Sequence, residues 1–365
     1  MTDAQWESLS NQGVAAAGVV YFLALLAYAV QWAALRDVPV RQAVSVGGRG
    51  GGGDTLVDDL PDERVAQRTE MAGRLGILLT GIGALAHFIA LLGRGLAADP
   101  NRVPWGNMYE FTLSATFVVV ALFLATTRRW RLAWLGPIVV GLVLCVLLAD
   151  VLWLYEPVAP LTEALESYWL VIHVVAACIA TGAFTLGGIT SLLYLLKARS
   201  TKKSGYLARL PEPAALDRIS YRMHAFGFPV WTFGVLISGP IWAHQAWSSY
   251  WNWDPKEVWA FITWVLYAAY LHARATAGWR GRKAALLALA AAATLWFNFI
   301  GINFFSTTSQ HSYAEGAAVE RTVQQTVDRP LETTSVVVGL GGGLRLRVEP
   351  AQEVGVVVGA EGPRA

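Results

Sequence analysis

The residues best suited to chemistry in this sequence are its histidines. They are His87, His173, His224, His244, His272 and His311. Imidazole can hold a metal through either ring nitrogen and can carry a proton near neutral pH. Inside a membrane span an imidazole is costly and indicates a functional site, although a hydrogen bond between helices is the alternative role. The two cysteines, Cys145 and Cys178, form no CxxC motif and predict packing rather than disulfide or redox chemistry.

Depth along the apolar stretches divides the histidines into groups. His173 lies ~8 Å of helix from a start near Tyr168, and His311 follows the last apolar stretch, so the two can meet at one level. His272 lies ~25 Å along a helix that starts at Pro255, close to the opposite level. Three histidines at two depths suit two sites better than one tetrahedral metal site. Each site then needs an imidazole from a second segment.

The other three histidines carry weaker signals. His224 and His244 lie near the two ends of one apolar stretch, where a polar side chain costs little, so we predict helix packing for both. His87 lies in the middle of a stretch, and both roles stay open for it.

Aromatic residues crowd the segment 242–259, which reads W-A-H-Q-A-W-S-S-Y-W-N-W-D-P-K-E-V-W. Its rings include Trp242, Trp247, Tyr250, Trp251, Trp253 and Trp259. An aromatic belt at the membrane interface is one explanation, but a belt spreads its rings over many helices. Four rings within residues 247–253 instead favour a platform for a large flat ligand, because stacked aromatic rings bury much area at low entropic cost.

The end of this segment has the pattern of a helix start. Asp254 is a natural N-cap, Pro255 a natural first helical residue, and Glu257 completes a capping box. We therefore assign Asp254 and Glu257 a structural role. The platform is predicted to be joined directly to the helix that carries His272.

Composition shows what must position these residues. The chain has 365 residues, of which 55% are hydrophobic and 15% charged, with a mean hydropathy of +0.44. This excludes a disordered tail protein and argues against an ordinary soluble enzyme, and a net charge of +2 gives no basis for nucleic-acid binding. Stretches of about 20 apolar residues can cross a bilayer. We predict an all-α polytopic membrane protein with about eight spans, at residues 13–34, 75–97, 108–127, 132–154, 168–196, 224–246, 256–276 and 284–304.

Basic residues predict the orientation. Of the 28 Lys and Arg residues, 20 lie in the connections that follow the odd-numbered spans, which places those connections in the cytoplasm. Residues 1–12, the tryptophan segment and residues 312–365 are then on the outer side. The Gly-rich loop 45–63 is cytoplasmic, and the tail 312–365 is predicted to be disordered or to hold a small hairpin. The first span lacks a basic region and a cleavage site, so we do not expect it to be a signal peptide.

Three segments carry a specific pattern. They are W-S-S-Y-W-N-W-D-P-K-E-V-W-A-F-I-T-W, followed by Y-A-A-Y-L-H-A-R, then R-V-P-W-G-N-M-Y-E-F at 102–111 and G-I-N-F-F-S-T-T-S-Q-H-S-Y at 301–313. Together they resemble the cytochrome c biogenesis proteins of the CcsA/ResC type, called CcsB in some bacteria, and the first resembles the tryptophan-rich "WWD" signature of the haem-handling proteins. The resemblance covers most of the chain from Pro104 to Tyr313. Ser248 stands where the family usually has Gly.

The resemblance implies that residues 13–311 form a haem-handling membrane domain for haem b in the plasma membrane. It implies an outer site in which His173 and His311 ligate the iron and Trp242, Trp247, Tyr250, Trp251 and Trp253 hold the ring. His272 would ligate haem at an inner site. A ResB-like subunit would supply the other inner ligand, with His87 or His224 as lower-ranked alternatives. Apocytochrome c, a thiol reductant and the lipid bilayer are the further partners expected, and the function implied is thioether attachment of haem to a CxxCH motif.

Two other functions fit the same residues. A haem exporter or haem-delivery protein would bind haem and perform no ligation. A structural membrane protein would use its histidines and tryptophans only for helix packing.

Overall fold

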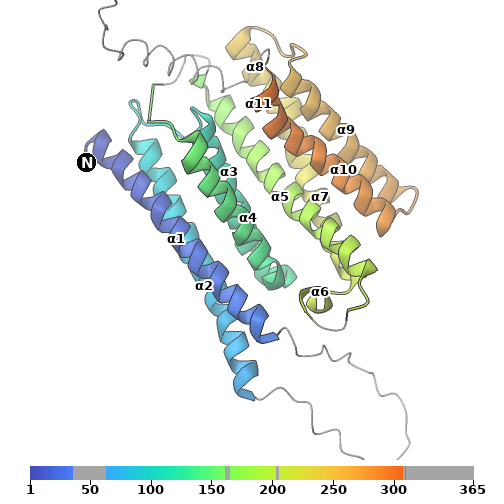
Figure 1. The fold of residues 1–365 in the computed structure, drawn as a ribbon. Coiled ribbons are helices and arrows are strands. Elements are labelled where there is room, and N and C mark those ends of the chain that lie inside the picture. The colour runs from blue at the N-terminus through green and yellow to red at the C-terminus, as the bar shows by residue number, and fades with distance from the viewer. Residues whose placement is uncertain (36–62, 161–164, 203–204, 307–308, 310–365) are drawn as a thin grey trace, which may run out of the picture. The chain divides into compact units, whose positions relative to one another are not determined.

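The structure, a computed structural model, describes residues 1–35, 63–160, 165–202, 205–306 and 309. Within these ranges the regular elements are all helices, which confirms the all-α prediction (Figure 1). Most of the Gly-rich loop 45–63, the whole tail 312–365 and His311 lie outside the described residues. The helices are α1 (Asp3–Leu35), α2 (Glu63–Leu96), α3 (Met108–Trp130), η1 (Ala133–Leu135), α4 (Gly136–Ala149), η2 (Asp150–Leu154), α5 (Tyr168–Arg199), α6 (Tyr206–Arg209), α7 (Pro213–Trp231), η4 (Thr232–Ser238), α8 (Gly239–Trp247), α9 (Pro255–Ala275), α10 (Arg282–Trp296), η5 (Phe297–Gly301) and α11 (Ile302–Phe305).

Seven helical segments of the described residues are long and apolar enough to cross a membrane. They span Asp3–Ala34, Gln67–Leu96, Met108–Trp130, Ala133–Leu154, Tyr168–Arg199, Pro213–Trp247 and Arg282–Gly301. The eighth predicted span, 256–276, is present as the helix α9, but α9 is less apolar than the others. Lys256 and Glu257 begin it, and His272 and Arg274 end it, so its polar residues lie at its two ends. The protein is a polytopic membrane protein.

Several helices extend beyond the apolar stretches from which they were predicted. The stretch predicted at 75–97 belongs to a helix that begins at Glu63, and the one predicted at 224–246 begins at Pro213. A helix keeps its hydrogen bonds beyond the hydrocarbon layer, so polar turns can continue it where hydropathy alone shows an end.

The central helix of the bundle is α5. It packs against α3 on one side and against α7 and α10 on the other, while α1 and α2 pair with each other next to α4 (Figure 1). The short helix α6 marks one end of the bundle and α8 the other, and we refer to these as the α6 end and the α8 end (Figure 1).

Three segments, η2, η4 and η5, are π-helical rather than α-helical. Each lies toward the α8 end, where its span approaches its terminus. A π-helical turn bonds each carbonyl one residue further along than an α-helix does, so it alters which carbonyls are open to other donors. The α8 end therefore has the irregular backbone on which a site can be built.

Candidate functional site

A pocket lies at the α8 end of the bundle, between the halves on either side of α5. Its walls come from the start of α3, the first turns of α5, η4, α8, the start of α9 and η5. Most of its lining is apolar, and seven aromatic residues contribute their rings: Trp105, Phe111, Trp231, Trp242, Tyr250, Trp251 and Phe299. Such a mostly apolar cavity with a few polar groups is typical of a cofactor site.

The polar group of greatest interest in this pocket is His173, in the second turn of α5. Its Nδ1 lies 2.8 Å from the carbonyl oxygen of Gly234 in η4. Its ring lies parallel to that of Trp242, with a 13° angle between the planes and 5.9 Å between the centroids. The consecutive segments η4 and α8, both distant in sequence from His173, thus hold the imidazole in one orientation.

The predicted aromatic residues do not all face the pocket. Trp242, Tyr250 and Trp251 line it. Trp247 packs edge-on against Trp242, with centroids 4.9 Å apart, and so supports the wall from behind. Trp253 is 73% exposed and points away from the bundle core.

The backbone explains why Trp253 turns outward. It has a φ of +56°, a left-handed conformation that is rare for a bulky residue. The carboxylate of Glu257 accepts from the N–H groups on both sides of it, Asn252 at 2.9 Å and Asp254 at 3.2 Å. The carboxylate therefore clamps the chain around Trp253 and stabilises the strained residue.

The predicted helix start at Asp254 is confirmed. Asp254 caps α9, Pro255 is its first residue and Glu257 completes the capping box. The Asp254 carboxylate accepts from Lys256 N–H at 2.8 Å and from the hydroxyl of Ser309 at 2.8 Å. This second bond ties the end of the described chain to the tryptophan segment.

The backbone at Ser248 explains why the tryptophan-rich signature usually has Gly at this position. Ser248, which ends α8, has a φ of +57°. Glycine is preferred at such left-handed helix ends, which accounts for the Gly expected at this position.

His224 belongs to α7 and packs against one face of α9, whereas His272 lies on a different face of α9. His224 is fully buried against Tyr267 and Tyr270, with centroids 5.1 Å from each, and neither of its ring nitrogens has a hydrogen-bond partner among the described residues. His272 is exposed, and it is two residues, or about 200° around the helix, from Tyr270. The structure therefore does not bring these two histidines together.

The remaining histidines make local contacts. His87 is buried between α1, α2 and α3, where Nε2 lies 2.9 Å from the Leu113 carbonyl and Nδ1 lies 3.4 Å from the Tyr21 hydroxyl. These contacts are those of an imidazole that bonds helices together. His244 is exposed and stacks on Tyr250, with centroids 4.2 Å apart.

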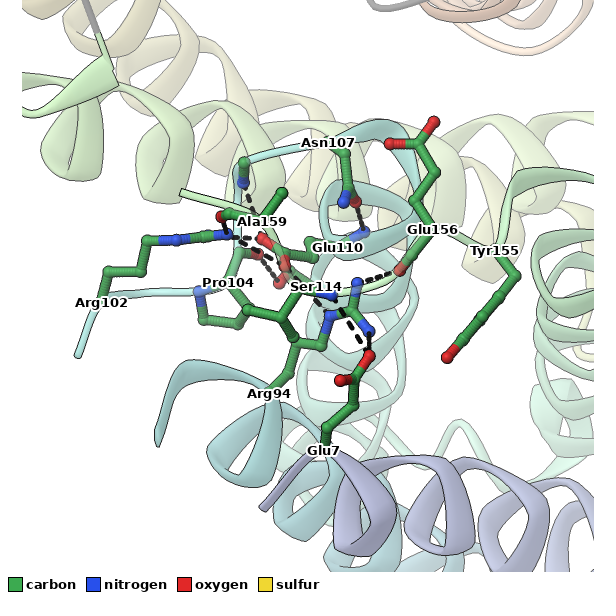
Figure 2. A network of polar contacts seen from close by, with 12 residues as sticks. Glu7, Arg94, Arg102, Pro104, Asn107, Glu110, Ser114, Tyr155, Glu156 and Ala159 are labelled. Carbon is green, nitrogen blue, oxygen red and sulfur yellow. Dashed lines mark hydrogen bonds and ion pairs between the residues drawn. The ribbon is translucent and has the colours of Figure 1, made fainter. Parts of the chain in front are cut away.

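A buried charge network, which the sequence did not reveal, supports the pocket wall (Figure 2). Glu110, at the start of α3, accepts from Arg94 Nε at 3.0 Å and from Arg102 at 2.6 Å, and Arg94 and Glu110 have fully buried side chains. Glu110 also accepts from the Gly106 N–H at 2.7 Å. Arg94 reaches Glu7 on α1 at 3.5 Å and donates to the Glu156 carbonyl.

This network fixes the connection between α2 and α3. Trp105 and Met108, which line the pocket, lie in and directly after the loop that Glu110 holds through Arg102 and Gly106. A buried ion pair is tolerated only when its remaining donors and acceptors are satisfied, as they largely are here. Glu110 is therefore a positioning residue for this wall.

Comparison with known proteins adds to this geometry. A family described as cytochrome c assembly protein matches residues 105–309, more than half of the chain. The chain belongs to the cytochrome c assembly protein family. The matched range agrees with the resemblance expected from Pro104 to Tyr313, and it includes every pocket element from Trp105 to η5.

Curated members of the family are similar over most of the chain. The cytochrome c biogenesis protein CcsA of Synechococcus sp. (strain JA-3-3Ab) is 31% identical over 311 residues, which cover 69% of this chain and 87% of that protein. CcsA of Guillardia theta is 34% identical over 236 residues, covering 59% of this chain and 78% of that protein. The prediction of a CcsA-type protein of cytochrome c biogenesis is thus confirmed.

The fold is shared with a solved structure. The cytochrome c haem lyase CcmF superposes with a TM-score of 0.53 at 17% identity, over 88% of this chain. The chain spans about half the length of CcmF, 52%. At 17% identity this likeness shows that the two chains share a fold, and it shows nothing about function.

We predict that the buried network stabilises the fold much more than a surface ion pair of the same residue types. Glu110→Gln leaves Arg94 buried without its carboxylate and is expected to lower the free energy of unfolding by about 3–5 kcal/mol. Glu70→Gln is the matched control, since Glu70 pairs with Arg74 at 2.6 Å with both side chains largely exposed. This change is expected to cost less than about 1 kcal/mol. Unfolding in detergent measures both, and equal losses would contradict the role given to Glu110.

Proposed function

We propose that the protein binds haem b in the α8-end pocket and presents it for attachment to apocytochrome c on the outer side of the plasma membrane. This proposal rests on the position of His173, which lies inside an aromatic pocket with its Nδ1 hydrogen-bonded to the backbone carbonyl of Gly234. A metal-ligating imidazole usually donates its other ring N–H to a carbonyl or carboxylate in this way, because that bond orients the ring and fixes its tautomer.

The residues of the pocket fit a haem. The indoles of Trp242 and Trp251 and the apolar walls suit a porphyrin, and Lys256, which also lines the pocket, suits its carboxylates. When bound, the haem would supply two vinyl groups, to which the thiols of a CxxCH motif add to form thioethers. The chain's own residues bind the ring, orient it and exclude water, which is the protein's part in cofactor chemistry.

His311 is proposed as the second outer ligand. Ser309, two residues earlier, is bonded to Asp254. Two residues of chain span at most about 7 Å, so this anchor supports the proposal that His311 reaches the pocket, which Lys256 and Glu257 line close to Asp254.

His272 is proposed as the ligand of a separate inner haem. Its side chain is exposed on a face of α9 that the described helices leave uncovered, and Phe261 and Val265 are exposed on α9 as well. An imidazole facing lipid is costly, so a second membrane protein is expected to cover it. A ResB-like subunit that supplies the other axial histidine fits this face, and a thiol reductant would keep the CxxCH cysteines available.

The outer ligands have a direct test. His173→Gly and His311→Gly are each expected to lower haem retention and to stop cytochrome c maturation, because each removes an axial ligand. Added imidazole is expected to restore part of both, since it can occupy the vacated ligand position. The absorption spectrum of the purified protein and the yield of holocytochrome are measured. Unchanged maturation in both variants would reject the assignment.

The aromatic wall has its own test. Trp251→Ala is expected to weaken haem retention by about 10-fold or more, because it removes a ring that lines the pocket. Trp253→Ala is expected to have a smaller effect, since Trp253 is outside the pocket lining, and Trp279→Ala, outside the tryptophan segment, no effect. Equal losses from the three variants would indicate an interfacial belt instead.

The inner site is tested by separating supply from binding. In cells, His272→Gly is expected to leave the outer pocket without haem and to block maturation. The purified variant is still expected to take up added haem with a spectrum that depends on His173 and His311. Normal maturation by His272→Gly would eliminate the inner site, and failure to rebind added haem would indicate that His272 only packs helices.

A further inference from the structure

We propose that the π-helical turn η4 is the device that positions His173, with the Gly234 carbonyl setting its tautomer, Ser238 moderating that bond and Gly239 leaving room for the ring. This inference deepens the proposed function and rests on its assignment of His173 as an iron ligand. Gly234, Ser238 and Gly239 are positioning residues, because they act through His173.

The bond between His173 and Gly234 decides which nitrogen carries the proton. A carbonyl oxygen only accepts, so the 2.8 Å contact requires the proton on Nδ1. In a neutral imidazole this places the lone pair on Nε2, which is the form that binds a metal. The tautomer needed for iron ligation is therefore set before haem arrives.

The π-helical geometry makes the Gly234 carbonyl a shared acceptor. It accepts the N–H of Gly239, five residues on, as a π-helix requires. It also accepts the Ser238 hydroxyl at 2.8 Å, in addition to His173. A carbonyl has two lone pairs, so three donors compete for them. The Ser238 hydroxyl is expected to weaken the bond from His173.

The position of the ring depends on the absence of a side chain at residue 239. A Cβ there would lie 3.1 Å from both Cε1 and Nδ1 of His173. Trp242, three residues further along α8, is stacked parallel to the same ring. The imidazole is thus held between the helix backbone at Gly239 and the indole of Trp242.

A simple packing role for these residues makes a different forecast from a positioning role. If the hydrogen bond only joined α5 to η4, removing the neighbouring hydroxyl would not change the reduction potential of a bound haem, and any loss in a variant would follow protein stability. A positioning role predicts changes at the His173 ring itself, in the haem-free protein as well as with haem bound.

The test uses the full-length protein in detergent, with the histidines labelled for ring-nitrogen NMR and haem absent. The signal that disappears in His173→Gly identifies the residue. In the unchanged protein we expect the proton on Nδ1 and the lone pair on Nε2. In Ser238→Ala we expect the Nδ1 signal to shift toward a stronger hydrogen bond, and the haem-loaded protein to show a lower iron reduction potential, because the ligand becomes a better electron donor.

Two further variants complete the design. Thr190→Val is the matched control, since it removes a buried hydroxyl bonded to a carbonyl of α5, at 2.7 Å, seventeen residues from His173. It is expected to change neither readout. Gly239→Ala is expected to displace the ring and to lower haem affinity by about 10- to 100-fold, the usual cost of disturbing a group that orients a metal ligand. In the double variant Gly239→Ala/His173→Gly, free imidazole is expected to restore haem binding.

The outcomes separate this inference from the function on which it rests. A proton on Nε2 in the haem-free protein, or identical behaviour of Ser238→Ala and Thr190→Val, would overturn the positioning role while His173 could still be a ligand. If His173→Gly keeps the haem spectrum of the unchanged protein, the proposed function fails, and the contact with Gly234 is then helix packing only.

Discussion

Hydrocarbon offers the backbone no hydrogen-bond partner, and this constraint governs where the chain can depart from a regular helix. Among the described residues the π-helical departures are η2, η4 and η5, all toward the α8 end. Their freed groups find partners inside the protein. The Gly234 carbonyl takes up His173 and Ser238, and the Phe299 carbonyl in η5 accepts from Asn303 at 2.7 Å. The irregular backbone that lines the pocket is thus also the backbone that orients its side chains.

Charge is subject to the same constraint. Arg94 and Glu110 are fully buried, and they persist because Arg102, Glu7 and backbone groups complete their hydrogen bonds. The network joins α1, α2, α3 and the segment after η2, so one cluster fixes several chain ends around the pocket wall. His272 contrasts with them, because its side chain is exposed on the surface of the helical bundle. Within the proposed function, this exposure is a reason for the protein to act with a second membrane subunit.

The tryptophan segment shows how one short stretch serves two surfaces. Trp251 lines the pocket, whereas Trp253, two residues later, is largely exposed. The carboxylate of Glu257 produces this division by binding the backbone on both sides of Trp253. The capping box of α9 therefore does more than begin a helix, since it also sets which indoles face the proposed haem. Through Asp254 it holds the segment that leads to His311 as well.

Much of the protein follows from the sequence alone. The apolar stretches determined a helical membrane protein, because a lipid-exposed backbone must satisfy its own hydrogen bonds. The start of α9 at Asp254, Pro255 and Glu257 was predictable because capping depends on residues within one turn. The separate depths of His173 and His272 also followed, since the rise of a helix is constant.

Only the tertiary structure decided how these helices face one another. Hydropathy does not fix the rotation of a helix that is apolar all round, so it could not show that His224 of α7 packs against a face of α9 that does not carry His272. Nor could it pair His173 with a carbonyl 61 residues later, or Arg94 with Glu110 across two helices. Those contacts depend on the packing of side chains between helices distant in sequence, and no local spacing encodes that packing.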